Sequence, residues 1–388
     1  MERNLKFSKE HEMFRATFRK FVENELLPNY AQWEKDRITP RSMWKRMGDL
    51  GFLCPWVEEK YGGIGTGWAN GTPDITWDLI MMEELGWKSV LGVFSHLHNL
   101  MTSPYIDTYG NDEQRARWLP GLVKGDLICA IAMTEPGTGS DLGRVRTRAV
   151  REGDYYIING SKTFISNGVL ADLVILVCKT DPQAGYRGLS LIVVERGTPG
   201  FERSKPIPKI GFHCQDTATL YFEDCRVPVA NLLGQEGDGW WQLMSKLQPE
   251  RLCACQISTC MAERAVELAV QYARERQIFG KPLSSFQNTQ FVLAECAAKA
   301  QIARTFTDTL AVNYMQGQDI TKEVSMGKQW ICEMAHEVAS KCLQIFGGYG
   351  YCQEYEISRI YADSRVMSIL AGSSEVMKLI VSRGIGLS

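Results

Sequence analysis

The chain has 388 residues, with 43 Lys or Arg against 45 Asp or Glu, so its formal net charge is −2. A balance this even gives no indication of a nucleic-acid partner or of an anionic membrane surface. At about 150 residues per domain, the length predicts two to three domains with a large core. The first ten residues are polar and charged, and no apolar run approaches the ~20 residues that span a bilayer. We therefore expect a cytoplasmic protein.

The twelve cysteines do not have the density of a disulfide scaffold in a chain of this length. Several of them, such as Cys129, Cys178 and Cys296, lie in apolar contexts, which predicts buried thiols in a reducing compartment. Cys253 and Cys255 have no second Cys or His pair nearby at the spacing of zinc ligands. The sequence therefore predicts no metal site.

Residues 1 to about 125 have the pattern of helices, and we assign them to an N-terminal helical domain. Thr39 is a candidate N-cap for a helix that begins with Pro40, because proline is favoured at the first helical position. The Gly-rich stretch 65–72 predicts a loop.

From 126 to 235 the chain consists of short apolar runs separated by Gly, Pro, Asp and Asn, a pattern typical of a small antiparallel β barrel or sandwich. The clearest runs are 155–158, 173–177, 189–194 and 217–222. From 236 to 388 the pattern is helical again, and in 292–310 apolar residues recur at spacings of three and four. Long helical stretches with short loops predict a bundle. We therefore expect an α+β protein with domains at 1–125, 126–235 and 236–388.

The stretch 131–142, Ile-Ala-Met-Thr-Glu-Pro-Gly-Thr-Gly-Ser-Asp-Leu, places turn formers and hydroxyls directly after a strand-like run. We expect Gly137 and Gly139 to give the backbone positive φ, so that it can approach a flat or phosphorylated ligand. Thr134 and Ser140 can form hydrogen bonds with the polar edge of such a ligand. An ordinary Pro-Gly surface turn has the same composition, so composition leaves both interpretations open.

This loop resembles the flavin-binding signature of the acyl-CoA dehydrogenases, and three further motifs resemble that family in the expected order. Residues 162–167, Lys-Thr-Phe-Ile-Ser-Asn, are similar to the segment whose aromatic ring packs on the isoalloxazine. The segment 276–281, with Phe286 and Gln287 after it, resembles the element that reaches the FAD of a neighbouring subunit. The segments 344–348 and 371–375 resemble the contacts to adenine and pyrophosphate and the rim of the acyl pocket.

The resemblance implies the acyl-CoA dehydrogenase architecture, including a C-terminal four-helix bundle, with FAD as cofactor and an acyl-CoA as substrate. The FAD contacts that it implies are Ile131, Met133, Thr134, Gly139, Ser140, Phe164, Ile165, Ser166, Arg276, Ile278, Phe279, Gln287, Gln344, Gly347, Gly348, Ser373 and Glu375. The substrate contacts that it implies are Ser140, Trp241, Gln248, Arg251, Ala371 and Gly372.

The position of the catalytic base departs from the commonest pattern of the family. Many members carry a catalytic glutamate immediately before the glycine that corresponds to Gly372, but this chain has Ala371, which cannot take a proton. A minority branch, which includes long-chain acyl-CoA and isovaleryl-CoA dehydrogenases, carries the glutamate on a helix in a Glu-Arg-Leu context. Residues 250–252 have that sequence here. The resemblance therefore implies that Glu250 is the base, although a surface glutamate beside Arg251 is the plainer alternative.

The implied reaction is the α,β-dehydrogenation of a saturated acyl-CoA to the 2-enoyl-CoA. Glu250 would take the α-proton, flavin N5 would accept the hydride, and the backbone N–H of Ala371 would be one donor to the thioester oxygen. Electron-transfer flavoprotein is the implied electron acceptor, and a homotetramer the implied assembly, with a dimer as runner-up. A flavin-dependent monooxygenase or oxidase of the same fold and a non-catalytic CoA-binding protein are the alternatives. The sequence does not identify the acyl chain.

Overall fold

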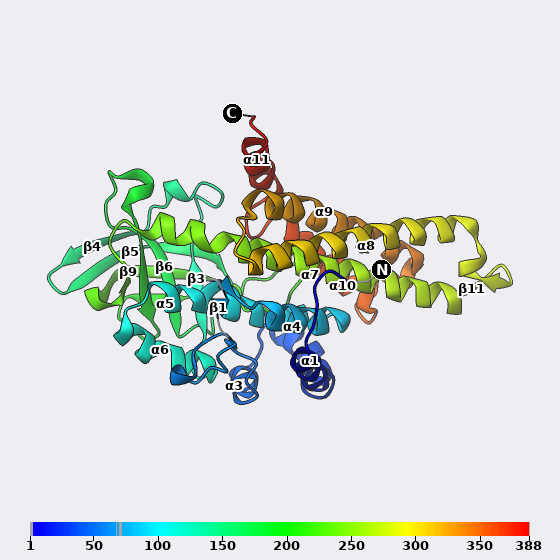
Figure 1. The fold of residues 1–388 in the computed structure, drawn as a ribbon, viewed down its shortest axis with the longest axis horizontal. Coiled ribbons are helices and arrows are strands. Elements are labelled where there is room, and N and C mark those ends of the chain that lie inside the picture. Colours follow the sequence, from blue (N-terminus) through cyan, green and yellow to red (C-terminus); the bar gives the residue numbers. More distant parts are fainter. Residues whose placement is uncertain (1–2, 67, 70–71, 388) are drawn as a thin grey trace.

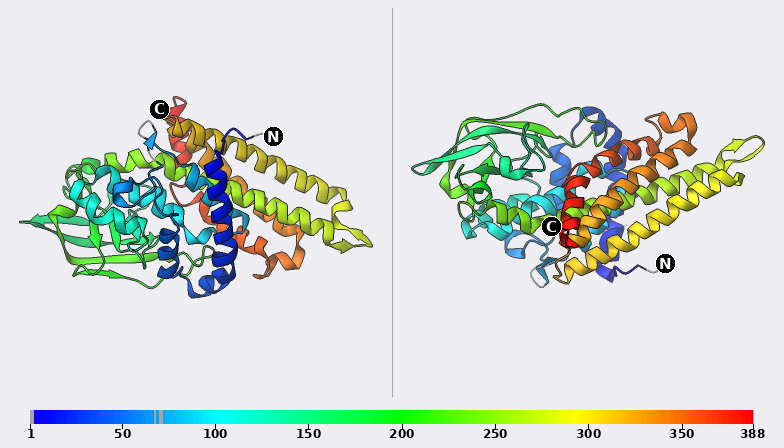
Figure 2. Two further views of the ribbon diagram at one scale, coloured as in Figure 1. Left: turned by 60° about the horizontal axis from the view of Figure 1, so that its bottom comes forward. Right: turned by 90° about the horizontal axis from the view of Figure 1, so that it is seen from above.

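The computed structural model describes residues 3–66, 68–69 and 72–387. A helical block, a β block and a second helical block follow one another along the chain, which confirms the expected fold class (Figure 1). The long C-terminal helices extend away from the β block, and a short hairpin lies at their far end (Figures 1 and 2). No helix in the described part of the chain is long and apolar enough to cross a membrane.

The prediction that Thr39 caps a helix beginning with Pro40 was wrong. Helix α3 begins at Arg41 with Pro40 as its N-cap residue, and no side chain caps it. The Thr39 hydroxyl instead donates to the carbonyl oxygen of Cys214 at 3.4 Å. The helices are α1 (Lys9–Phe21), α2 (Leu27–Asp36), α3 (Arg41–Asp49), α4 (Thr76–Trp87), α5 (Ser103–Tyr109) and α6 (Asp112–Val123).

The predicted loop at 65–72 lies partly outside the described residues, which omit 67, 70 and 71. Two short strands, β1 (Trp68–Ala69) and β2 (Thr72–Pro73), pair there in antiparallel fashion.

The β block is one eight-stranded sheet in the order β10-β7-β6-β4-β5-β9-β8, with β3 paired to β6. Its strands are β3 (Cys129–Ala132), β4 (Arg148–Glu152), β5 (Tyr155–Ile165), β6 (Leu173–Lys179), β7 (Leu189–Glu195), β8 (Phe201–Arg203), β9 (Ala218–Pro228) and β10 (Leu232–Leu233). The sheet is mixed rather than purely antiparallel, because β3 runs parallel to β6. The β4–β5 hairpin separates these two strands along the chain, so β6 can return in the direction of β3.

Strand β6 is buried along both faces, which explains its uninterrupted apolar run. Leu173, Ile175 and Val177 pack into a core shared with helices α5 and α6. Val174 and Leu176 point the other way, into the core between the sheet's own strands. The sheet therefore separates two hydrophobic cores.

The C-terminal block consists of α7 (Gly239–Glu275), α8 (Gln287–Met315), α9 (Thr321–Ile345), α10 (Glu356–Ser364) and α11 (Ser374–Gly384). On α7, Ala262, Ala265, Ala269 and Ala273 are fully buried at spacings of three and four, so neighbouring helices approach closely. Strands β11 (Gln277–Ile278) and β12 (Lys281–Pro282) form the hairpin between α7 and α8.

All twelve cysteines lie within the described residues, and all are free thiols. Eleven are buried, and Cys352 is exposed.

Candidate active site

The 131–142 loop is closed by reciprocal backbone hydrogen bonds between Glu135 and Thr138, at 2.9 and 3.1 Å. The Glu135 carboxylate anchors the loop to the sheet. It accepts hydrogen bonds from the backbone N–H groups of Arg146 and Thr147 and from the buried Lys162 ammonium, the last at 2.9 Å. Burial alone would raise the pKa of Glu135, but the charge of Lys162 and these hydrogen bonds lower it. The sequence analysis did not single out this buried pair.

The prediction that Gly137 and Gly139 adopt positive φ was wrong. Their value to the loop is the absence of a side chain: a Cβ at Gly137 would meet no atom within 4 Å, so the backbone is open to an approaching ligand. The Thr134 carbonyl accepts from the Thr163 N–H at 2.9 Å, which joins this loop to the 162–167 segment. Ile131 lies on β3, and the Met133 carbonyl accepts from Lys162 at 2.9 Å.

Phe164 projects from this segment with 65% of its surface exposed and a φ of 58°. A left-handed phenylalanine costs free energy, so the surrounding structure must hold it. Asn167, also left-handed, exchanges hydrogen bonds with the buried Gln215 side chain at 3.1 and 2.9 Å. The Asp216 carboxylate accepts from the backbone N–H groups of Val169 and Leu170, which follow Asn167 in the same turn. Between Phe164 and Asn167, Ile165 is buried and Ser166 is half-buried.

The hairpin after α7 presents the second group of predicted FAD contacts. Phe279 at its tip is 92% exposed with a φ of 48°. The Arg276 guanidinium lies 5.9 Å from the ring centroid of Tyr349, which places the hairpin beside the 347–351 turn. Gly347 and Gly348 have open space where a Cβ would be. The remaining predicted contacts of this group lie on the hairpin and on the helices next to it: Ile278, Gln287 and Gln344.

These two groups of predicted FAD contacts do not meet within one chain. The first group belongs to the β block, and the hairpin lies beyond the end of the bundle that points away from this block (Figures 1 and 2).

Glu250 lies on α7 and is half-buried. Burial raises the pKa of its carboxyl, and the charges of Arg251 and Lys328 oppose that rise. Burial, and next the charge of Glu250, raise the pKa of Tyr105 on α5. Among the described residues, none forms a hydrogen bond with the buried Tyr105 hydroxyl. Glu250 is therefore not a fully solvated carboxylate on the helix surface.

The turn before α11 places Ala371 and Gly372 in the left-handed region, with φ of 53° and 89°. The carbonyl oxygen of Gly372 accepts from the Lys328 ammonium at 2.6 Å. Lys328 therefore connects this turn with the surroundings of Glu250. No described residue accepts a hydrogen bond from the backbone N–H of Ala371.

Other predicted contacts are spread around this region. Arg251 is buried, and its Nη1 donates to the Ser325 hydroxyl at 3.4 Å. Gln248 accepts from the Ile320 N–H at 3.0 Å and so has a structural partner. Trp241 is 77% exposed near the start of α7. Ser373 caps α11, Glu375 lies in its first turn, and Ser140 is exposed on the first loop.

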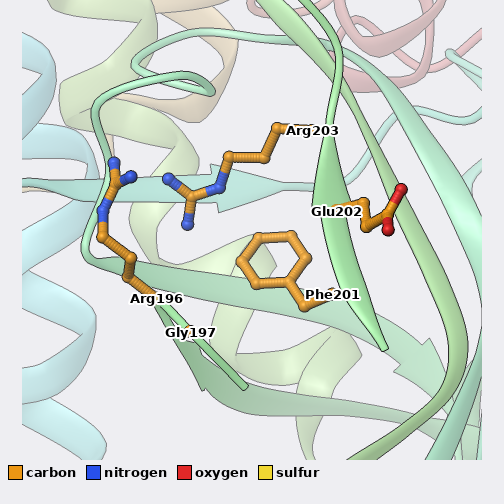
Figure 3. Close-up of a pocket in the computed structure, with 5 residues that line it drawn as sticks. All are labelled: Arg196, Gly197, Phe201, Glu202 and Arg203. Atoms are coloured by element: carbon orange, nitrogen blue, oxygen red, sulfur yellow. The ribbon is translucent and has the colours of Figure 1, made fainter. Parts of the chain in front are cut away.

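A surface pocket on the β block contains none of the predicted site residues (Figure 3). The Arg196 and Arg203 guanidinium groups lie close together in it (Figure 3). Each donates to the carbonyl oxygen of Val169, at 2.7 and 3.0 Å. Both arginines therefore brace the turn that follows Phe164.

Comparisons with known proteins give one consistent result. Sequence models of the acyl-CoA dehydrogenase N-terminal, middle and C-terminal domains match residues 8–126, 130–225 and 237–386. The chain is 39% identical over 381 residues to a mitochondrial long-chain specific acyl-CoA dehydrogenase of Sus scrofa, covering 98% of this chain and 87% of that one. It is 36% identical to an acryloyl-CoA reductase (NADH) of Anaerotignum propionicum, covering 97% and 94%.

The crystal structure of an acyl-CoA dehydrogenase from Geobacillus kaustophilus superposes with a TM-score of 0.95 at 51% identity, covering 98% of this chain and 99% of the other. The chain therefore belongs to the acyl-CoA dehydrogenase family. It is a flavin-dependent enzyme of acyl-CoA metabolism, and its cofactor is FAD. The exposed Phe164 ring and the open backbone at Gly137, Gly347 and Gly348 fit such a planar, phosphorylated group.

Proposed function

We propose that the enzyme dehydrogenates its acyl-CoA between Cα and Cβ, with Glu250 as the base that takes the α-proton. The observation that carries this proposal is the surrounding of Glu250, a half-buried residue that interacts electrostatically with Tyr105 and with Lys328, whose ammonium also holds the Gly372 carbonyl. Ala371, at the commoner position for the base, has no titratable group.

The proposed mechanism needs two contributions from the protein. The α-proton of a thioester is too weakly acidic for an ordinary carboxylate, and the burial that raises the pKa of Glu250 makes it a stronger base. The Ala371 N–H is an available donor for the thioester oxygen as negative charge develops there. One preorganised donor of this kind contributes about 3–4 kcal/mol in other enzymes. FAD, when bound, supplies the hydride acceptor that side chains lack.

The first experiment determines the reaction and the substrate together. Purified protein with bound FAD is mixed anaerobically with acyl-CoAs of different length and branching, and flavin absorbance is followed. We expect bleaching, with 2-enoyl-CoA as product, and the preferred chain among long or branched acyl groups, as in the long-chain branch. A protein that binds acyl-CoA without bleaching would be a binding protein, and a requirement for oxygen would identify a monooxygenase or oxidase.

A second candidate direction comes from the Anaerotignum relative, which is named for the reduction of acryloyl-CoA with NADH. The same preparation is therefore tested with 2-enoyl-CoA and NADH. NADH oxidation faster than acyl-CoA-driven bleaching would favour the reductase direction.

The test of the base is Glu250→Gln, which keeps the shape of the side chain and removes its basicity. We expect FAD content and acyl-CoA affinity to persist while the rate of flavin bleaching falls by about 10²- to 10⁴-fold, the usual cost of losing a general base. A double variant that adds Ala371→Glu offers a carboxylate from the other position and tests whether activity returns. A Glu250→Gln enzyme with near-native bleaching would refute the assignment.

We further propose a homotetramer, with a dimer as runner-up, that passes electrons to an electron-transfer flavoprotein in a cytoplasmic setting. The separation of the two groups of predicted FAD contacts supports an oligomer, since a second copy can bring its hairpin to the first group. Light scattering of the FAD-loaded protein should give a multiple of 43.8 kDa. A fully active monomer would contradict the proposal.

A further inference from the structure

Lys328 links the surroundings of Glu250 to the turn at Ala371, and the sequence analysis did not single it out. It lies on the stripe of α9 that faces the core, where Val324, Ile331 and Ala335 recur at spacings of three and four. Its side chain is fully buried. A lysine in an apolar stripe is costly unless its charge is used, because burial disfavours an ammonium.

The Lys328 ammonium makes one hydrogen bond in the described part of the chain, to the carbonyl oxygen of Gly372 at 2.6 Å. This carbonyl belongs to a left-handed turn in which Ala371, with φ of 53°, is strained and Gly372 accepts its φ of 89° without strain. On the other side, the Ser373 side chain caps α11. The turn is therefore held between an ammonium and a helix cap, which fixes the direction of the Ala371 N–H.

Four titratable groups interact electrostatically with the Glu250 carboxylate. They are Arg251 and the Cys253 thiol on the same helix, Lys328 on α9 and Tyr105 on α5. Arg251 has the Ser325 hydroxyl as a partner, whereas Lys328 is the only cation that α9 directs toward Glu250 among the described residues.

The Lys328 ammonium has its own neighbours. Burial lowers its pKa, and the nearby Cys332 and Cys255 thiols and Glu250 oppose that fall. Both cysteines are buried and have raised pKa values, so at neutral pH they are uncharged thiols. Of these neighbours, Glu250 is the one with a carboxyl group.

We infer that Lys328 is a positioning residue for the dehydrogenation: its ammonium holds the 371–373 turn so that the Ala371 N–H meets the thioester oxygen. This inference rests on the proposed function of Glu250.

The test replaces Lys328 with methionine, which fills the same space without a donor or a charge. We expect the rate of anaerobic flavin bleaching to fall by about 10²-fold, near the cost of losing one oxyanion donor, with little change in KM. Loss of the cation raises the pKa of Glu250. Because the base acts deprotonated, the acid limb of the kcat/KM profile should move to higher pH. In Lys328→Gln, which lacks the charge but retains a donor, the limb should also move, while the rate should fall less.

A binding measurement separates positioning from catalysis. Calorimetry compares a saturated acyl-CoA thioester, titrated anaerobically into enzyme already inactivated by Glu250→Gln, with the CoA thioether of the same chain, which has no carbonyl oxygen. Adding Lys328→Met should weaken binding of the thioester and leave binding of the thioether unchanged. Equal affinities for the thioester with and without Lys328 would overturn the positioning role.

The matched control is Val324→Ala, one turn earlier on the same buried stripe of α9. It creates a cavity and should lower the melting temperature without moving the acid limb. If Lys328→Met behaves like this control while Glu250→Gln is inactive, the inference fails and the proposed function stands. If Glu250→Gln keeps native turnover, the proposed function fails, and the inference fails with it.

Discussion

At the scale of one residue, Phe164 is held in a conformation that is costly on its own. Its ring is exposed and its backbone is left-handed, two features that folding alone does not favour. The bonds of Asn167 to Gln215 keep this arrangement in place.

We predict that Phe164→Ala and Phe164→Gly both weaken FAD binding, because both remove the aromatic face. An aromatic stacking contact is worth about 0.5–1.5 kcal/mol, so the Kd should rise by about 2- to 10-fold. The two variants should differ in stability: glycine accepts positive φ and should give the higher melting temperature of the apoprotein, by the equivalent of about 1 kcal/mol. Fluorescence titration and thermal melts measure the two effects. Equal FAD affinity in the variants and the native protein would exclude a stacking role.

At the scale of elements, the turn before α11 has little room for change. A Cβ on Gly372 would lie 2.7 Å from Cε of Met377, in addition to the strain of φ +89°. Lys328 holds this turn on one side and the Ser373 cap holds it on the other. Any displacement of Gly372 would therefore also shift the Ala371 N–H.

Gly372→Ala should therefore lose activity more than stability, with kcat reduced by about 10²-fold, as for a lost oxyanion donor. Gly153, in the turn between β4 and β5, is the matched control: its φ is +59°, but a Cβ there would meet nothing within 4 Å. Gly153→Ala should cost about 1 kcal/mol through backbone strain and leave kcat unchanged. Native kcat in Gly372→Ala would show that the turn is not needed in this conformation.

The sequence predicted the elements well where periodicity was the signal. The strand-like runs at 173–177 and 189–194 correspond to β6 and β7, and the periodic stretch 292–310 lies within the long helix α8. It could not predict the parallel pairing of β3 with β6, because a strand buried on both faces has no alternation that marks its partner. The sequence could not predict the proposed role of Lys328 for a different reason, because that role depends on a hydrogen bond to a carbonyl 44 residues away.

At the scale of the whole molecule, a buried ionic network joins the N-terminal segment to the bundle. The Glu83 carboxylate on α4 contacts Arg3 and Arg15 at 2.7 Å and Arg304 on α8 at 3.3 Å. Burial would raise the pKa of Glu83, but the charge of Arg304 and the hydrogen bond from Arg3 lower it to about 2. Charges of both signs that are far apart in sequence thus fix how the two helical blocks dock.

Glu83→Gln leaves buried guanidinium charge uncompensated, so the free energy of unfolding should fall by about 3 kcal/mol or more at pH 7. Since the folded pKa lies below the ordinary value of 4.5, this contribution is complete above pH 4.5 and is lost as the pH falls toward about 2. The native protein should therefore lose this stability on acidification, and the variant should not. Denaturant unfolding at several pH values measures the difference. Glu323→Gln, which removes a half-buried carboxylate whose ion pair is with the neighbouring Lys322 at 3.1 Å, is the control, and equal stability of the two variants would contradict the prediction.

The distribution of buried and exposed thiols gives the native chain a single site for thiol labelling. Only a thiolate reacts readily with a maleimide, and burial raises the pKa of interior thiols such as Cys129 to about 12. Cys352 is exposed and directly follows the 347–351 turn, beside the hairpin. A fluorescent dye can therefore be attached at this one position without mutagenesis. Its quenching or shielding would report, in real time, the arrival of a second copy at this end of the bundle.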